Sequence, residues 1–167
     1  DGDTYGAGRY LRANLVDRYR DVENGDWKLL MWDTKSGPKM PKGSVGFRWG
    51  EELGKWNLTL EDGVDDSPID PELSFLDTHD AVLQVGFHEF ASGKRARRGV
   101  PVRYVETSEG RVPVATVYDL LMAQFGVGRG LAGDYAESFD DENAPYTPAW
   151  QEQFTGIGRE TVLRLAR

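Results

Sequence analysis

The residues best suited to chemistry lie in a run rich in glycine and tryptophan, where Arg48, Trp49 and Trp56 are close neighbours. An arginine shielded from water by tryptophans can hold an anion, such as a cofactor phosphate or a negatively charged substrate. This makes Arg48 the candidate cofactor-binding residue. A structural role also explains the run, with glycines in turns or bulges, tryptophans in the core and Arg48 paired with a carboxylate such as Glu51. We favour the structural interpretation.

His79 and His88 are the only histidines, and carboxylates lie near both in the sequence. A hairpin that brought the two rings together could bind zinc, but their spacing matches no established ligand pattern. We interpret them as surface or hairpin histidines. The chain has no cysteine and no G-x-S-x-G nucleophile motif. The sequence therefore predicts no metal ligand and no catalytic residue in this chain.

Two further patterns resemble ligand sites without fitting them. Gly128 to Gly133 match G-x-G-x-x-G, but they follow a predicted helix and not a strand, so we interpret them as a helix terminator and turn. Two acidic groups lack the alternating ligand spacing of a calcium loop, and we interpret both as solvated loops. These groups are Asp62, Asp65 and Asp66, and Asp140, Asp141 and Glu142.

Charge and hydropathy limit the possible partners. The formal net charge of −8 argues against a nucleic-acid partner, because a protein that neutralises phosphates needs a basic face. The basic cluster from Lys94 to Arg98 is predicted to be a solvated loop joining two strands, since no aromatic residues are interleaved with it. No apolar run approaches the roughly 18 to 20 residues of a bilayer span, so we expect a soluble segment with no direct membrane span.

Hydrophobic periodicity predicts an α+β chain, strand-rich from about residue 8 to 115 and helical from about 116 to 167. With 167 residues the chain can bury a core, and one domain is the default expectation. Alternation with one buried face occurs from Trp56 to Leu60 and from Leu83 to Phe87. Glycine, proline and aspartate joints between short strands favour an antiparallel or mixed sheet. Further strands are expected over Trp27–Trp32, Val45–Trp49 and Val100–Glu106, and a polar surface excursion over Glu61–Thr78.

The period becomes helical after Arg111 and predicts helices near 116–125, 148–154 and 159–167. Thr116, with Asp119 three residues later, is expected to cap the first helix. A proline follows Thr147, which suits the first position of a helix behind a cap.

Three stretches, in the same order, resemble the catalytic (alpha) subunit of respiratory nitrate reductase, a molybdenum oxidoreductase. The first holds Ala7-Gly8-Arg9 and Leu11-Arg12-Ala13, the second holds Gly43 to Glu51 and Gly54 to Leu58, and the third holds Thr116 to Leu120, Tyr146 to Trp150, Glu152-Gln153 and Thr155-Gly156. The resemblance spans nearly the whole chain.

The resemblance implies a parent enzyme that reduces nitrate to nitrite by oxygen-atom transfer. Its cofactors would be bis-molybdopterin guanine dinucleotide with molybdenum and a 4Fe-4S cluster. Its partners would be the rest of the catalytic subunit, an iron–sulfur beta subunit and a membrane cytochrome subunit, in a complex at the cell membrane, with the cytoplasmic face favoured. The chain would form part of a larger molybdopterin oxidoreductase α/β architecture.

The same resemblance implies that the cluster ligands and the molybdenum ligand lie upstream of these motifs, in a subunit several times longer. We therefore expect an internal fragment that starts at Asp1 and stops within a helical pattern at Arg167. Such a fragment would be scaffold, without cofactors of its own, and inactive alone.

Two alternatives stay open on the sequence. The chain could be a stand-alone β-rich module that binds sugars or peptides on a platform of exposed tryptophans. The platform would draw on Trp27, Trp32, Trp49, Trp56 and Trp150. A related molybdenum reductase for selenate or chlorate would instead share the cofactor and differ in substrate.

Overall fold

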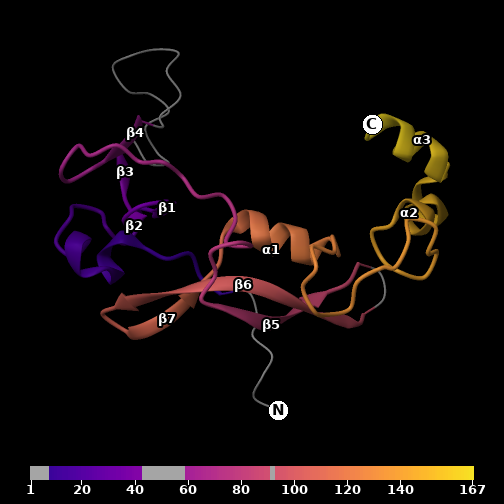
Figure 1. Cartoon of the computed structure of the whole chain (residues 1–167), viewed down its shortest axis with the longest axis horizontal. Coiled ribbons are helices and arrows are strands. Elements are labelled where there is room, and N and C mark those ends of the chain that lie inside the picture. The colour runs from indigo at the N-terminus through magenta and orange to yellow at the C-terminus, as the bar shows by residue number, and fades with distance from the viewer. Residues whose placement is uncertain (1–7, 43–58, 91–92) are drawn as a thin grey trace. The chain divides into compact units, whose positions relative to one another are not determined.

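The computed structural model describes residues 8–42, 59–90 and 93–167 and has the predicted α+β composition, with antiparallel strands followed by helices (Figure 1). Its contacts divide it into two compact units. The N-terminal unit contains Gly8–Phe75 and Arg103–Val114, and the helical unit contains Leu76–Val102 and Ala115–Arg167. Each unit has its own hydrophobic cluster.

The N-terminal unit consists of short elements around Ala13, Tyr19 and Met40, which are buried together. Two 3-10 turns, η1 (Ala13–Leu15) and η2 (Asp17–Tyr19), precede the strands. Strands β1 (Met31–Asp33) and β2 (Gly37–Lys39) form one antiparallel pair, and β3 (Pro41–Lys42) and β4 (Thr59–Asp62) form another. The end of β6 (Arg95–Thr107) pairs with β7 (Gly110–Val114).

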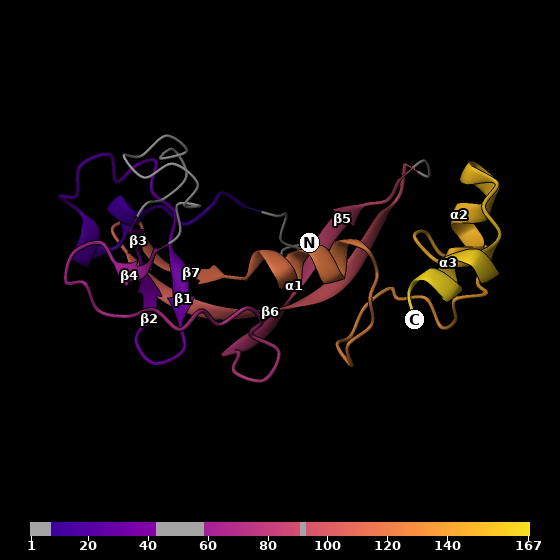
Figure 2. The same ribbon diagram turned by 90° about the horizontal axis from the view of Figure 1, so that it is seen from above.

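In the helical unit, β5 (Ala81–His88) pairs antiparallel with the first part of β6, from Ala81↔Val102 to His88↔Arg95. The predicted alternation is confirmed at the core, because Val85 and Phe87 are buried together with Val100 and Val102 of β6. Helix α1 (Val117–Gln124) lies across these two strands and adds Ala123 to the same cluster (Figures 1 and 2).

The three predicted helices are confirmed. Besides α1 they are α2 (Pro148–Thr155) and α3 (Arg159–Leu165). The Thr116 hydroxyl accepts the Asp119 amide at 3.0 Å, and the Thr147 hydroxyl accepts the Trp150 amide at 3.0 Å. Gly156 ends α2 with a φ of 69°, a left-handed conformation that glycine adopts without a steric penalty.

Thr147→Ala is expected to lower the free energy of unfolding by about 1 to 2 kcal/mol, because it removes the N-cap of α2. The hydroxyl also donates to the Asp141 carbonyl at 2.6 Å, so the alanine leaves a second group without its partner. Urea unfolding followed by circular dichroism would measure the change. Thr147→Ser keeps the hydroxyl and serves as the control, and equal midpoints for the alanine and serine variants would contradict the capping role.

Three predictions about the strands need correction or qualification. The cluster from Lys94 to Arg98 is not a loop, because β6 begins at Arg95 and its first part pairs with β5. In the predicted Trp27–Trp32 strand, only the last two residues belong to β1, and Trp27 lies in a turn with 73% of its surface exposed. The predicted Val45–Trp49 strand lies outside the described residues.

The expected surface excursion over Glu61–Thr78 is also partly wrong. It contains the last residues of β4, and three of its side chains, Asp62, Ile69 and Phe75, are buried. The prediction rested on the polar composition of the segment. Hydrogen bonds and local packing nevertheless bury these three side chains between exposed turns. Within the described ranges, no helix has the length and apolar character that crossing a bilayer requires.

Candidate functional site

The candidate cofactor-binding residue, Arg48, lies outside the described residues, as do Trp49 and Trp56. The assignment of Arg48 to an anion and its structural alternative both stay predictions.

His79 and His88 lie at opposite ends of β5. The Nδ1 atom of His79, just before the strand, lies 2.8 Å from the Leu76 carbonyl oxygen, while His88 is the last residue of the strand and faces Arg95 in the register. The two imidazoles therefore do not meet. Across residues 8–42, 59–90 and 93–167, no three histidine, aspartate or glutamate side chains form a group able to hold a metal ion.

In the second acidic group, Asp140 and Glu142 form ion pairs with one arginine. Arg159, at the start of α3, pairs with Asp140 at 3.2 Å and with Glu142 at 3.0 Å. The hydrogen bonds that the Arg159 guanidinium donates to Asp140 and then to Glu142 raise its pKa. These exposed carboxylates connect their loop to α3, in agreement with the predicted solvated loop.

For the first acidic group, the prediction of a solvated loop is wrong at Asp62, because this side chain is completely buried. The Tyr19 hydroxyl donates to its carboxylate, the Val64 amide donates at 2.9 Å, and Arg18 lies 3.5 Å away. Burial, and next the hydrogen bond to Asp62, raise the pKa of Tyr19, so the phenol keeps its proton and remains a donor. Asp62 is a structural acceptor in the N-terminal unit and not part of a solvated loop.

Asp33, at the end of β1, is a second buried carboxylate that the sequence did not single out. It accepts the Ser36 hydroxyl at 2.6 Å, the Ser36 amide at 2.9 Å and the Asp70 amide at 2.8 Å. The Ser36 hydroxyl first, and then the Asp70 amide, hold the pKa of Asp33 well below its ordinary value. Asp33 thus connects the β1–β2 turn to the segment at Asp70 as a permanent anion.

The lowered pKa predicts the pH dependence of Asp33→Asn. A carboxylate with a depressed folded-state pKa stabilises the fold above its unfolded-state pKa of about 4, and this stabilisation is lost as the pH falls towards the folded-state value. Asp33→Asn should therefore be less stable than wild type at pH 7, with the difference shrinking at pH 3. Urea unfolding at both pH values measures it, with the exposed Asp17→Asn as control. A difference that is equal at both pH values would contradict the assignment.

The Gly128–Gly133 stretch is irregular, with bends and a bridge from Gly133 to Arg98, and it is not the predicted turn. It follows α1, and the next described helix begins only at Pro148. Its end runs back along β6, where the Gly99 amide donates to the Ala132 carbonyl at 2.8 Å. A Cβ atom on Gly133 would lie 2.6 Å from the Arg98 Cα, so this close approach of two backbones requires glycine.

Arg98, which was predicted to lie in a solvated loop, is buried, with only 3% of its surface exposed. Its guanidinium donates to the carbonyls of Ala123 at 3.0 Å, Gln124 at 3.1 Å and Asp134 at 2.6 Å. It therefore satisfies the Gln124 carbonyl at the end of α1 and adds a second donor to the Ala123 carbonyl, which also accepts the Gly126 amide. Extending the alternation of buried Val102 and Val100 back along β6 would have placed Arg98 on the inner face.

Asp119 forms a buried charge pair in the helical unit. The sequence predicted its position in the α1 cap, but not its pairing with Arg129, whose Nη1 lies 2.8 Å from the Asp119 carboxylate. Asp119 is fully buried, and the Arg129 side chain is 13% exposed. The pair joins the start of α1 to the turn that follows it.

Trp32 and Trp150 serve packing more than a shared platform, whereas Trp27 is 73% exposed. Trp32 packs edge-to-face on Phe75, with 5.0 Å between ring centroids, and the Arg103 guanidinium stacks 4.7 Å from its ring. Trp150 lies 4.6 Å from the Phe154 ring within the helical unit. Each of these side chains therefore has its own local partners.

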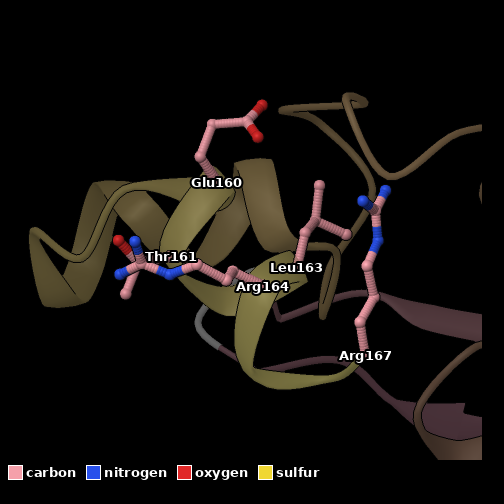
Figure 3. Close-up of a pocket in the computed structure, with 5 residues that line it drawn as sticks. All are labelled: Glu160, Thr161, Leu163, Arg164 and Arg167. Atoms are coloured by element: carbon pink, nitrogen blue, oxygen red, sulfur yellow. The ribbon is translucent and has the colours of Figure 1, made fainter.

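One hollow on the surface belongs to α3 and the end of the chain alone. Figure 3 shows its lining, in which Glu160, Arg164 and Arg167 carry charges and extend in different directions. Because these charges do not converge on one point, the hollow presents no arrangement for chemistry.

Comparison with known proteins decides what kind of chain this is. No protein-family model matches it. It is 40% identical to the respiratory nitrate reductase 1 alpha chain of Escherichia coli (strain K12) over 98% of its own length. It is 36% identical to the nitrate reductase alpha chain of Bacillus subtilis (strain 168) over 100% of its length, and 35% identical to the nitrate reductase alpha subunit of Mycobacterium tuberculosis (strain CDC 1551 / Oshkosh) over 99%.

The chain is homologous to a segment of nitrate reductase alpha chains. It spans 14% of the length of each of these relatives. The resemblance drawn from the sequence motifs is thereby confirmed. The buried charges of this chain are paired within the chain itself, which agrees with a structural contribution.

Proposed function

We propose that this chain is a structural segment of the catalytic subunit of a nitrate reductase. The full-length subunit would reduce nitrate to nitrite by oxygen-atom transfer at a molybdenum cofactor. The supporting observation is the identity of 35 to 40% to alpha chains along 98 to 100% of this chain. The segment would supply packed structure, and its charged core residues would maintain the fold.

The residues of this chain do not fit the metal groups that such an enzyme uses. An iron–sulfur cluster is held mainly by cysteine thiolates, and the sequence contains no cysteine. Among the described residues, the buried cation Arg98 is occupied by backbone carbonyls, and Arg129 by Asp119. We therefore assign molybdenum and the 4Fe-4S cluster to other parts of the parent subunit, together with most contacts to bis-molybdopterin guanine dinucleotide, for which Arg48 stays the candidate residue of this chain.

The proposed partners follow from the same assignment. They are the rest of the catalytic subunit, an iron–sulfur beta subunit and a membrane cytochrome subunit, with nitrate as substrate and the complex at the cell membrane, where the cytoplasmic face is favoured over the other side. Purified full-length protein, produced in cells that make the molybdenum cofactor, should reduce nitrate with an artificial electron donor. Reduction of selenate or chlorate without nitrate reduction would overturn the choice of substrate.

The 167-residue chain alone is expected to have no nitrate reductase activity and no stoichiometric molybdenum, iron or zinc. Cofactors carry this class of chemistry, and the chain has no thiol to retain a soft metal. Nitrite formation and elemental analysis after chelation measure the two expectations. Nitrite production proportional to the amount of chain, or one tightly held metal per chain, would contradict the structural assignment.

A further inference from the structure

Helix α1 is apolar on two sides. Its inner side, with Leu120 and Ala123, packs on the core of β5 and β6 (Figure 2). Along its outer side, Val117, Leu121 and Phe125 follow one another at four-residue spacing and expose 52%, 45% and 49% of their surfaces. Residues at that spacing lie on one face of a helix, so the outer side carries a continuous apolar stripe.

This stripe contains no charge. The one charged residue of α1, Asp119, is fully buried and paired with Arg129. A helix that packs one face on a core and faces water with the other normally carries polar residues outside, whereas a helix that is apolar all round belongs to the interior of a larger protein. The composition of α1 therefore fits a helix covered on both sides.

Aromatic rings extend the stripe towards α2. Phe125, just after α1, packs edge-to-face on Tyr146 with 5.5 Å between centroids, and Tyr146 contacts Trp150 of α2 at 5.5 Å. Trp150 in turn contacts Phe90 at 6.0 Å and Phe154 at 4.6 Å. Phe90 and Phe154 are 60% and 54% exposed, so a connected set of rings presents its outer side to solvent.

We propose that this surface is a contact face buried by another part of the same alpha chain. The α1–α2 apolar face is defined here by Leu121, Phe125, Phe90 and Phe154, with Val117 at its end. The proposal rests on the proposed function, in which the chain is one segment of a longer subunit. Contiguous exposed apolar surface is uncommon on free proteins, and its usual explanation is an interaction.

Two observations favour the same chain over a transient partner. The matched relatives are far longer than this chain, which spans 14% of them, so a homologous subunit carries much further polypeptide in the same molecule. Such a covalently linked surface meets its partner at high effective concentration. An uncharged face of aliphatic and aromatic side chains also resembles a permanent, core-like interface more than the polar, wet surface of a transient one.

Hydroxyl-radical footprinting of the full-length alpha subunit tests the proposal. The subunit is first shown to be monomeric by light scattering, and labelling of each residue is compared with that of the unfolded protein. Exposures of 45 to 60% within this segment predict protection of only about twofold at Leu121, Phe125, Phe90 and Phe154. Burial by the rest of the chain predicts protection of about tenfold or more, as for a desolvated interface core. Protection of about twofold in the monomer would overturn the proposal.

A variant pair gives a second measurement. In the full-length subunit, Leu121→Glu places a charge in the proposed contact and should sharply lower the yield of soluble, folded protein, while Leu121→Met keeps apolar volume and should behave as wild type. Equal yields and melting temperatures for all three proteins would contradict burial.

Further outcomes separate the alternatives. Protection that occurs only in a dimer, or only with a beta subunit, would assign the face to another chain and overturn the proposal. Nitrate reduction is measured separately on the same preparation. A subunit that reduces nitrate but leaves the face accessible refutes this inference alone, whereas a protected face in a subunit without nitrate reduction refutes only the assigned activity.

Discussion

Replacing Asp119 by alanine is expected to lower the free energy of unfolding of this chain by about 3 to 5 kcal/mol, the usual cost of breaking a buried ion pair from one side. The carboxylate is fully buried and accepts the Arg129 guanidinium at 2.8 Å and the Thr116 hydroxyl at 2.9 Å. Its loss would remove the carboxylate that neutralises Arg129 and weaken the start of α1. Denaturant unfolding of the purified chain measures the effect.

Two controls isolate the charge pair. Arg129→Met in the Asp119→Ala background removes the second charge, and it should recover part of the lost stability because no buried cation then lacks this carboxylate. Asp140→Ala removes an exposed carboxylate and should cause little change. A double variant no more stable than Asp119→Ala would show that the pair itself contributes little.

Arg98→Met is expected to cost a similar amount, about 3 kcal/mol or more, although methionine keeps much of the apolar stem. The reason is that the carbonyls of Gln124 and Asp134 lose their donor, while the Ala123 carbonyl keeps only the Gly126 amide, and each buried acceptor left without a partner costs about 1 to 3 kcal/mol. Hydrogen exchange should show the end of α1 opening more readily than in wild type.

The neighbouring arginine provides a matched control for this variant. Arg97 lies on the opposite, exposed face of β6, and Arg97→Met should change the free energy of unfolding by no more than about 0.5 kcal/mol. Arg98→Lys tests the geometry of the guanidinium, because one ammonium group cannot reach carbonyls on two segments in the same way. Equal stability of the Arg97 and Arg98 variants would show that the buried hydrogen bonds are not important.

Features that depend on near neighbours in the chain could be predicted from the residues alone. The ends of α1 and α2 follow from Thr116, Thr147 and Gly156, because a cap acts on backbone groups within the next turn. The buried face of β5 follows from the alternation of Val85 and Phe87. The family resemblance likewise required only runs of residues in order, and the comparisons confirm it.

The roles of the charged residues depended on partners that are distant in the sequence. Arg98 was placed in a solvated loop, but its acceptors lie 25 to 36 residues further along the chain. Asp62 was placed in another such loop, but its donor Tyr19 lies 43 residues earlier. Composition assigns charge to the surface by default, since burial of a charge is costly without compensation. Only the folded chain supplies the hydrogen bonds that compensate for it, because the alternation along β6 can place Arg98 on the inner face but cannot identify its distant acceptors.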